Sequence, residues 1–256
     1  MREFTLKNNI GEVYRLNSLD NFLHEPEGIG FTRNTTYKKI GTNYEVIQDG
    51  FEQTPVKGQI MFKTDLVNSA YIKYLKFSRF LQEIPLTLIY RIPGGEFYID
   101  ALPGAVEKTE INGALGMDVG ITLMPTSMWY RKVKETGTGS VTVKSDSKNE
   151  SPVCLKITGK SVSNSALSWS QTVDGVSKMT GSLTGVTIAS SDTVYIRTDV
   201  NPYQIYKVSS GGTRTDLYAK SNFTTSRFPF FYKGVNQFSV SGASITVEGR
   251  ILYETV

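Results

Sequence analysis

Cysteine and histidine are almost absent from this chain, which has one of each among 256 residues. Cys154 has no second cysteine with which to form a disulfide within the chain or a cysteine-based zinc site. His24, beside Glu25 in a predicted loop, is the one imidazole available to a catalytic triad, and we interpret it as a surface or interface residue. Histidine metal sites are excluded by the same count, and the acidic spacing of an EF-hand loop is missing. The sequence therefore predicts no metal, no cofactor and no catalytic residue, with Cys154 buried as a small apolar side chain.

Long apolar runs and blocks of one charge are missing as well. No segment approaches the roughly 20 apolar residues of a membrane-spanning helix, and the first residues lack the apolar core of a signal peptide. We therefore expect synthesis in a cytoplasm and no membrane contact. The net charge of +4 comes from the part of the chain after Thr136, which contains 12 basic and 8 acidic residues. This excess is spread along the sequence, whereas a nucleic-acid surface needs clustered Lys and Arg with stacking aromatics, so no DNA or RNA reader is predicted.

Helical periodicity is scarce, and a single segment, Thr64–Ile84, is predicted as a long helix. At about 3.6 residues per turn, one apolar stripe is expected to lie on a sheet: Val67, Ala70, Tyr71, Tyr74, Phe77, Leu81 and Ile84. Two apolar side chains fall towards the polar side instead, which predicts a second contact there. The candidates for a subunit interface on this side are Ile72, Lys76, Arg79 and Phe80.

The rest of the chain predicts β-strands, and its composition changes near Lys134. Four serines precede this residue and twenty follow it, and the run Lys134–Ser140 has the glycine and threonine content of a linker. The length also exceeds that of one average domain. We therefore predict a mainly β protein of two domains, 1–135 and 136–256. Two placements stay open for Ile251–Val256, which belongs to the second domain or folds back on the first.

Each half has its own strand pattern. In the first, Tyr44–Ile47 and Gly58–Phe62 are the predicted arms of a long hairpin, and the polar stretch Gln48–Val56 is its projecting tip. This tip adds Gln48 and Phe51 to the candidate subunit contacts. In the second half, closely spaced strands with no helical period predict an antiparallel β-sandwich, in which Asp174-Gly175 forms a two-residue hairpin turn.

Two interpretations concern saccharides. Glycoside hydrolysis needs two carboxylates beside aromatic side chains, and Glu107 with Glu110 is the obvious pair. Residues three apart on an extended strand point to opposite faces, so both carboxylates can reach one substrate only if a β-bulge lies between them. We therefore predict no enzyme. Trp169 lies among serines on an alternating strand. It is either a core residue, which we favour, or a platform that stacks on a sugar.

The order of four segments in the first half is distinctive: Pro26–Gly30, with glycines that favour unusual φ angles or a close approach, then Tyr71–Leu81, Leu86–Tyr90 and Ser127–Tyr130. Together these segments resemble the distal tail protein family of long, non-contractile-tailed bacteriophages. The resemblance implies a first domain that is a tail-tube-like β-sandwich with one helix and a projecting hairpin. It implies a second domain similar to a galectin or carbohydrate-binding sandwich, although the histidine and the Asn-Pro-Arg run of galectin sugar sites are missing from this half.

The resemblance also implies a function, that of a structural hub of a phage tail tip or baseplate and not of an enzyme. Six copies would form a ring, alone or back to back with a second ring, through which DNA passes only as cargo. The implied partners are the major tail-tube protein, a tail-associated fibre or lysin protein, and baseplate or receptor-binding proteins that serve host adsorption. The implied location is the virion. The alternatives are a module that binds a host cell-wall saccharide and, third, a glycosidase with paired carboxylates.

Overall fold

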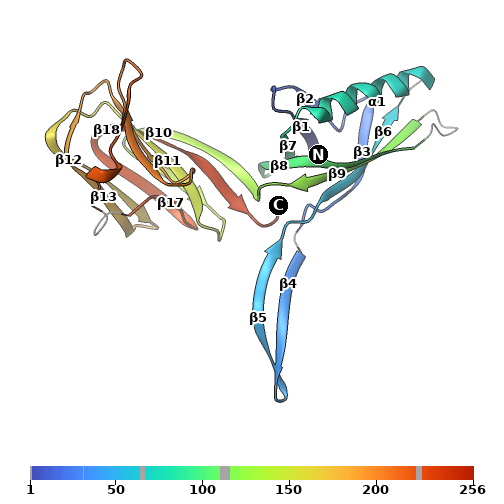
Figure 1. Cartoon of the computed structure of the whole chain (residues 1–256), viewed down its shortest axis with the longest axis horizontal. Coiled ribbons are helices and arrows are strands. Elements are labelled where there is room, and N and C mark those ends of the chain that lie inside the picture. The colour runs from blue at the N-terminus through green and yellow to red at the C-terminus, as the bar shows by residue number, and fades with distance from the viewer. Residues whose placement is uncertain (1, 31, 64–66, 110–115, 223–226) are drawn as a thin grey trace. The chain divides into compact units, whose positions relative to one another are not determined.

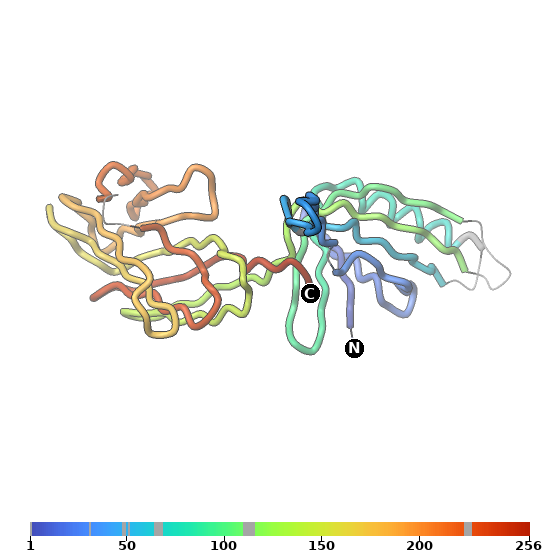
Figure 2. The backbone as a smooth tube through the Cα atoms, turned by 90° about the horizontal axis from the view of Figure 1, so that it is seen from below, coloured from blue at the N-terminus to red at the C-terminus, as the bar shows by residue number. Residues whose placement is uncertain are grey.

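The computed structural model describes residues 2–30, 32–63, 67–109, 116–222 and 227–256, apart from the side chains at 48, 49, 51, 67 and 68. This part of the chain is mainly β-strand with one α-helix, as the sequence predicts. It divides into two units, Met1–Tyr130 together with Tyr253–Val256, and Arg131–Leu252. Figure 1 labels most of the elements, and in Figure 2 the backbone can be followed to the red C-terminal end of the last strand.

The first unit consists of a sheet, a separate hairpin and the helix. Its elements in chain order are β1 (Glu3–Lys7), β2 (Val13–Arg15), β3 (Asn21–Glu27), β4 (Thr32–Ile40), β5 (Asn43–Glu52), β6 (Val56–Lys63), α1 (Val67–Gln82), β7 (Leu86–Ile92), β8 (Gly95–Lys108), β9 (Gly116–Pro125) and the start of β10 (Trp129–Ser145).

The sheet of the first unit has the strand order β3-β6-β9-β8-β7-β1-β2 with antiparallel neighbours. It curls until its ends meet, because the Leu23 N–H donates to the Leu16 carbonyl oxygen at 2.9 Å and Asn17 bridges to Phe22. Alternate residues of each strand point into this curl, and among them Phe62 is fully buried. The inner face of the curled sheet is therefore the core of the first unit.

Helix α1 lies beside the strands of the first unit (Figure 1) and packs on this core through aromatic side chains. Phe77 is fully buried, with its ring centroid 5.8 Å from that of Phe62 and 4.9 Å from that of Tyr14. Ala70 and Leu81, which the sequence places on the same stripe, are also buried. The expected apolar stripe thus has its centre where the periodicity predicts it, while the predicted first residues of the helix, 64–66, lie outside the described part of the chain.

The edges of the stripe differ from the prediction in two places. Phe80, predicted on the polar side as a subunit contact, is buried to 7% exposure because its ring reaches Tyr14 of β2, at 5.5 Å between centroids. Phe80 is therefore a core residue and no longer an interface candidate. Ile84, predicted on the buried stripe, is 47% exposed because α1 ends at Gln82 and the chain turns away.

The long hairpin exists, but its strands are not those predicted. Strands β4 and β5 pair with each other and with no other described strand, and Gly41-Thr42 forms the turn between them. Tyr44–Ile47 lies on one arm of this hairpin, while Gly58–Phe62 belongs to β6 inside the curled sheet. The prediction was wrong because the first arm, Thr32–Ile40, is polar and exposed on both faces, so it lacks the alternation that marks a half-buried strand.

The base of the hairpin depends on Gly28, the first glycine of the Pro26–Gly30 loop. Its φ is +75°, and a Cβ there would lie 2.0 Å from the Pro55 carbonyl oxygen. The Thr54 hydroxyl also donates to the Gly28 carbonyl oxygen at 3.3 Å. The unusual φ and the close approach expected from the sequence are both confirmed at this residue.

The second unit consists of strands with one short 3₁₀ turn. After the remainder of β10 its elements are β11 (Ser151–Thr158), β12 (Val162–Val173), β13 (Val176–Ile188), β14 (Thr193–Arg197), β15 (Gln204–Val208), β16 (Arg214–Asp216), η1 (Tyr218–Lys220), β17 (Phe230–Phe231) and β18 (Gly234–Tyr253).

Strand β18 joins two groups of strands in the second unit. Its first part pairs with β12, from Asn236 to Ser239, and its later part pairs with β11, from Ser244 to Gly249. The change of partner falls at Gly242, whose φ is +66°. The predicted Asp174-Gly175 turn is confirmed, since both residues have positive φ and Val173 pairs with Val176.

The predicted linker Lys134–Ser140 is a strand and not a turn-rich connection. It lies within β10, where the hydroxyls of Thr136 and Thr246 are 2.9 Å apart and Lys134 Nζ lies 3.2 Å from Glu248. These partners are more than 100 residues away along the chain, so composition gave no sign of them. The last residues, Tyr253–Val256, group with the first unit, and the Tyr253 ring lies 5.4 Å from Phe97.

We expect Phe77→Ala to lower the free energy of unfolding of the first unit by about 3–5 kcal/mol, because it removes a fully buried ring and leaves a cavity. Ile72→Ala is the matched control on the outward face of the same helix and should change the free energy of unfolding of an isolated subunit by no more than about 0.5 kcal/mol. Urea unfolding followed by circular dichroism measures both. Equal losses for the two variants would contradict the packing of α1 described above.

Candidate interaction surfaces

The outward face of α1 combines apolar side chains with cations. Ile72 and Leu75 are each 53% exposed, although both are large and apolar. Lys76 and Arg79 are exposed beside them. Leu75 was missed in the sequence, although its position three residues after Ile72 places it on the same side of a helix. This set of four residues is called the α1 face below.

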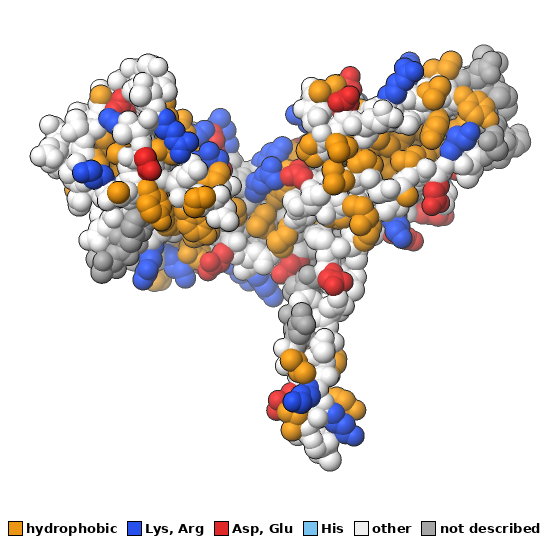
Figure 3. Space-filling model, in the orientation of Figure 1, with side chains coloured by type: hydrophobic (Ala, Val, Ile, Leu, Met, Phe, Trp, Pro, Cys, Tyr) orange, Lys and Arg blue, Asp and Glu red, His pale blue; other side chains and the backbone are white. Residues whose placement is uncertain are grey.

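The β4–β5 hairpin is a second exposed apolar surface (Figure 3). It carries large apolar residues with exposures of 48–66%: Tyr37, Ile40, Tyr44, Val46 and Ile47. A two-stranded hairpin alone is at best marginally stable in water, and an exposed apolar surface of this kind is typical of an interaction site. The candidate contacts Gln48 and Phe51 belong to β5, but their side chains lie outside the described part of the structure.

Among the described residues, those considered for catalysis do not gather into one site. His24 lies in strand β3 and not in a loop, and its Nε2 is 3.5 Å from Asp118 Oδ1 on β9. Glu107 lies at the end of β8, and Glu110 is outside the described residues. Within the described ranges, no group of three or more His, Cys, Asp or Glu side chains is placed to hold a metal ion. The one described α-helix is too short and too polar to cross a membrane.

Cys154 is buried in β11, as the sequence predicts, with 6% exposure. Burial, with a smaller contribution from the nearby Asp199 carboxylate, raises the pKa of its thiol to about 11. A thiol with a raised pKa carries little thiolate at neutral pH and is a poor nucleophile. Cys154 is therefore a structural residue.

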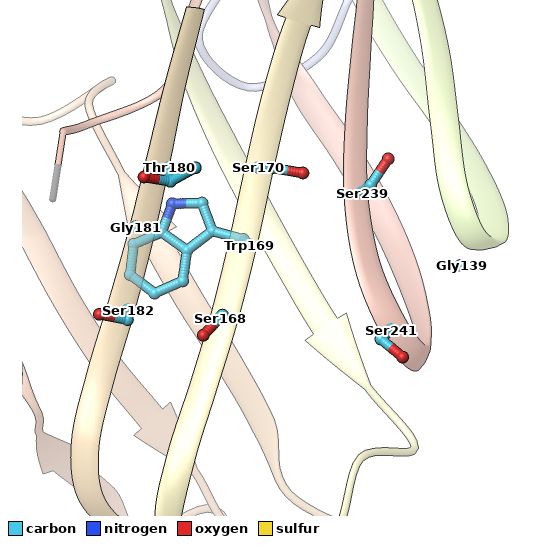
Figure 4. A pocket seen from close by; sticks show the side chains of 9 residues that line it. All are labelled: Gly139, Ser168, Trp169, Ser170, Thr180, Gly181, Ser182, Ser239 and Ser241. Carbon is cyan, nitrogen blue, oxygen red and sulfur yellow. The ribbon is translucent and has the colours of Figure 1, made fainter. Parts of the chain in front are cut away.

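Trp169 is a core residue, and the alternative of an exposed stacking platform is wrong. Its side chain is 3% exposed and covers Gly181 on the neighbouring strand β13, where a Cβ would lie 2.2 Å from the indole. A buried indole has no free face for a sugar. The pocket beside it, of 620 Å³, is lined mainly by hydroxyl side chains (Figure 4): Ser168, Ser170, Thr180, Ser182, Ser239 and Ser241.

Comparison with known protein families gives a match for the first part of the chain. Residues 3–126 match the model of the distal tail protein, N-terminal domain. The N-terminal domain of this chain belongs to the distal tail protein family. The α1 face and the β4–β5 hairpin both lie inside the matched residues, so the two exposed apolar surfaces are features of the distal tail protein domain.

Solved structures extend the likeness in fold to the whole chain. A chain of the phage P2 baseplate in its activated conformation with Ca has a TM-score of 0.64 at 13% identity, with 100% of both chains covered. The SPP1 Dit protein, described as a paradigm of the hub adsorption apparatus of phages that infect Gram-positive bacteria, has a TM-score of 0.67 at 10% identity, covering 97% of this chain and 99% of that one. At such identities the likeness establishes the fold. No curated protein gives a significant match.

Outside the distal tail protein domain, the packing of Trp169 yields a test. We expect Gly181→Ala to destabilise the second unit by about 1–3 kcal/mol, because the added methyl group displaces a buried indole. Thr180→Ala, at the exposed position before it, is the matched control and should have little effect. Tryptophan emission during thermal unfolding reports the change directly. A Gly181→Ala variant with parental stability would show that the indole does not lie over this glycine.

Proposed function

We propose that this protein is the structural hub of a phage tail tip or baseplate. Six copies form a ring, single or back to back with a second one, that joins the tail tube to the tail-associated fibre or lysin protein. The rim of the ring anchors proteins that adsorb to the host, and DNA passes through the ring as cargo. The protein is located in the virion, and its role is to position partners without a catalytic step.

The match of residues 3–126 to the distal tail protein family supports this proposal more than any other observation. The descriptions of the similar folds, a P2 baseplate and an SPP1 adsorption hub, agree with it. The proposal extends these descriptions to the present chain.

The exposed surfaces of the first unit add a physical argument. In a ring, one surface of each copy contacts a different surface of the next copy. The ring closes when the rotations that relate neighbouring copies add up to a full turn. The α1 face and the β4–β5 hairpin are two such surfaces on one unit. Each exposes apolar side chains to water, which does not stabilise an isolated subunit and is typical of a protein–protein contact. The α1 face adds two cations, Lys76 and Arg79, which favour a partner surface with carboxylates or carbonyl oxygens.

We expect Ile72→Asp to fold with parental circular dichroism but to sediment as smaller species than the parent. The side chain is exposed in the subunit, so the charge costs little there, whereas in a subunit contact it is desolvated without a partner. Tyr44→Asp, on the hairpin, should act in the same way. Val176→Asp is the matched control, since it replaces a 71% exposed apolar residue of the second unit.

Sedimentation velocity over a wide concentration range, with negative-stain microscopy, gives the readout. Rings for the parent and for Val176→Asp, with smaller species for Ile72→Asp and Tyr44→Asp, are the expected result. A parent that stays monomeric at every concentration would refute the ring. Rings that survive both substitutions would place the contact on another surface.

A further inference from the structure

Four aromatic rings form a row on the second unit. The Tyr203 ring lies 5.1 Å from Phe228 and 5.9 Å from Phe230, and Phe228 lies 6.1 Å from Tyr218. They come from three separate segments, the loop before β15, the 3₁₀ turn and the region of β17. Tyr203 and Tyr218 are each 41% exposed, so the row is a partly open surface and not a closed core.

A pocket of 570 Å³ opens beside these rings. Its lining consists of Pro152, Thr198, Asp199, Val200, Asn201, Pro202, Tyr203 and Tyr218. Asp199 is the one charged side chain in this lining, and both of its carboxylate oxygens accept hydrogen bonds from Arg197, at 2.9 and 2.8 Å. The charge at the pocket is therefore compensated, and a neutral ligand fits it better than an ion.

The loop that forms the pocket is held in place before any ligand arrives. The Thr198 hydroxyl accepts from the Val153 N–H at 2.7 Å, and its one hydrogen is shared between the carbonyl oxygens of Val153 and Pro229, both at 3.0 Å. These bonds tie the loop to β11 on one side and to the aromatic segment on the other. A site that is already in place loses less conformational entropy on binding.

We infer that this pocket binds a neutral saccharide. The apolar C–H face of a sugar ring packs against the half-exposed rings of Tyr203 and Tyr218, as aromatic side chains with a polar edge allow. Sugar hydroxyls donate to the Asp199 oxygens, each of which keeps a free lone pair after its bond to Arg197. The exposed Asn201 amide both donates and accepts. An apolar wall with a few fixed polar groups is the usual composition of a small-ligand site.

The neighbouring hydroxyl-lined pocket beside Trp169 does not meet these requirements. It is lined by no exposed aromatic ring, because the Trp169 indole is buried. The pocket beside Tyr203 and Tyr218 has such rings in its lining. The inference concerns the second unit alone, so it does not depend on ring formation by the first.

The test uses the full-length protein on an array of neutral mono- and oligosaccharides of glucose, galactose, rhamnose, N-acetylglucosamine and N-acetylgalactosamine. Titration calorimetry then measures the best of these. We expect Tyr203→Ala to weaken binding about tenfold or more, and Asn201→Ala, at an exposed position, to weaken it without loss of stability. Val176→Ala, which truncates an exposed side chain of the second unit outside this lining, and Ser241→Tyr, which fills the other pocket, should bind like the parent.

Several results would overturn the inference. They are no binding to any neutral saccharide, binding only to acidic saccharides or proline-rich peptides, and loss of binding in Ser241→Tyr but not in Tyr203→Ala. If Tyr203→Ala does not fold, Asn201→Ala decides between the outcomes. Sedimentation of the same samples reports ring formation separately, so failure of the saccharide site leaves the proposed hub function intact.

Discussion

The burial of Phe77 is the contact on which the first unit depends. Its ring lies between Phe62 of the curled sheet and Tyr14 of β2, and complete burial of such a side chain contributes roughly 1.5–3 kcal/mol. This contact also sets the rotation of α1 about its own axis. Because a helix advances by 3.6 residues per turn, a buried Phe77 leaves Ile72 and Leu75 on the outward side. The α1 face is thus a consequence of how the core packs.

The base of the hairpin imposes a second constraint. Gly28 brings one leg within backbone contact of Pro55 on the other, which no residue with a Cβ allows. Both legs therefore leave the sheet side by side, and the apolar residues of β4 and β5 are presented at a distance from the core of the unit. Neither strand pairs with a third strand among the described residues, so one edge of each is open, which is the arrangement that the proposed subunit contact requires.

In the second unit, local packing separates the aromatic residues into two groups with different uses. Trp169 is covered because glycine at position 181 leaves room for the indole, and it stabilises the sandwich. Tyr203 is half exposed, in a loop that the Thr198 hydroxyl ties to β11 and to Pro229, and it is the ring on which the proposed saccharide site depends. An aromatic side chain in a β-protein is thus a core or a surface residue according to what its neighbouring strands leave open.

Several features of this protein are determined by the sequence alone. They are the mainly β composition, the single helix with Phe77 on its buried side, the Asp174-Gly175 turn and the burial of Cys154. Each rests on local periodicity or on the φ preference of one or two residues, which act within a few positions along the chain. The order of motifs between Pro26 and Tyr130 likewise pointed to the distal tail protein family without knowledge of the fold, and the family model matches residues 3–126.

Other features were decided by the tertiary structure, because they depend on partners far apart in the sequence. Phe80 became a core residue through Tyr14, and Lys134–Ser140 became a strand because it pairs beside Thr246 and Glu248. The pairing of β4 with β5 was not predicted, because β4 is a polar strand with no periodic signal. The aromatic row around Tyr203 brings together segments that share no motif. Contacts of this kind leave no trace in local composition, so only the folded chain shows which surfaces remain free to bind.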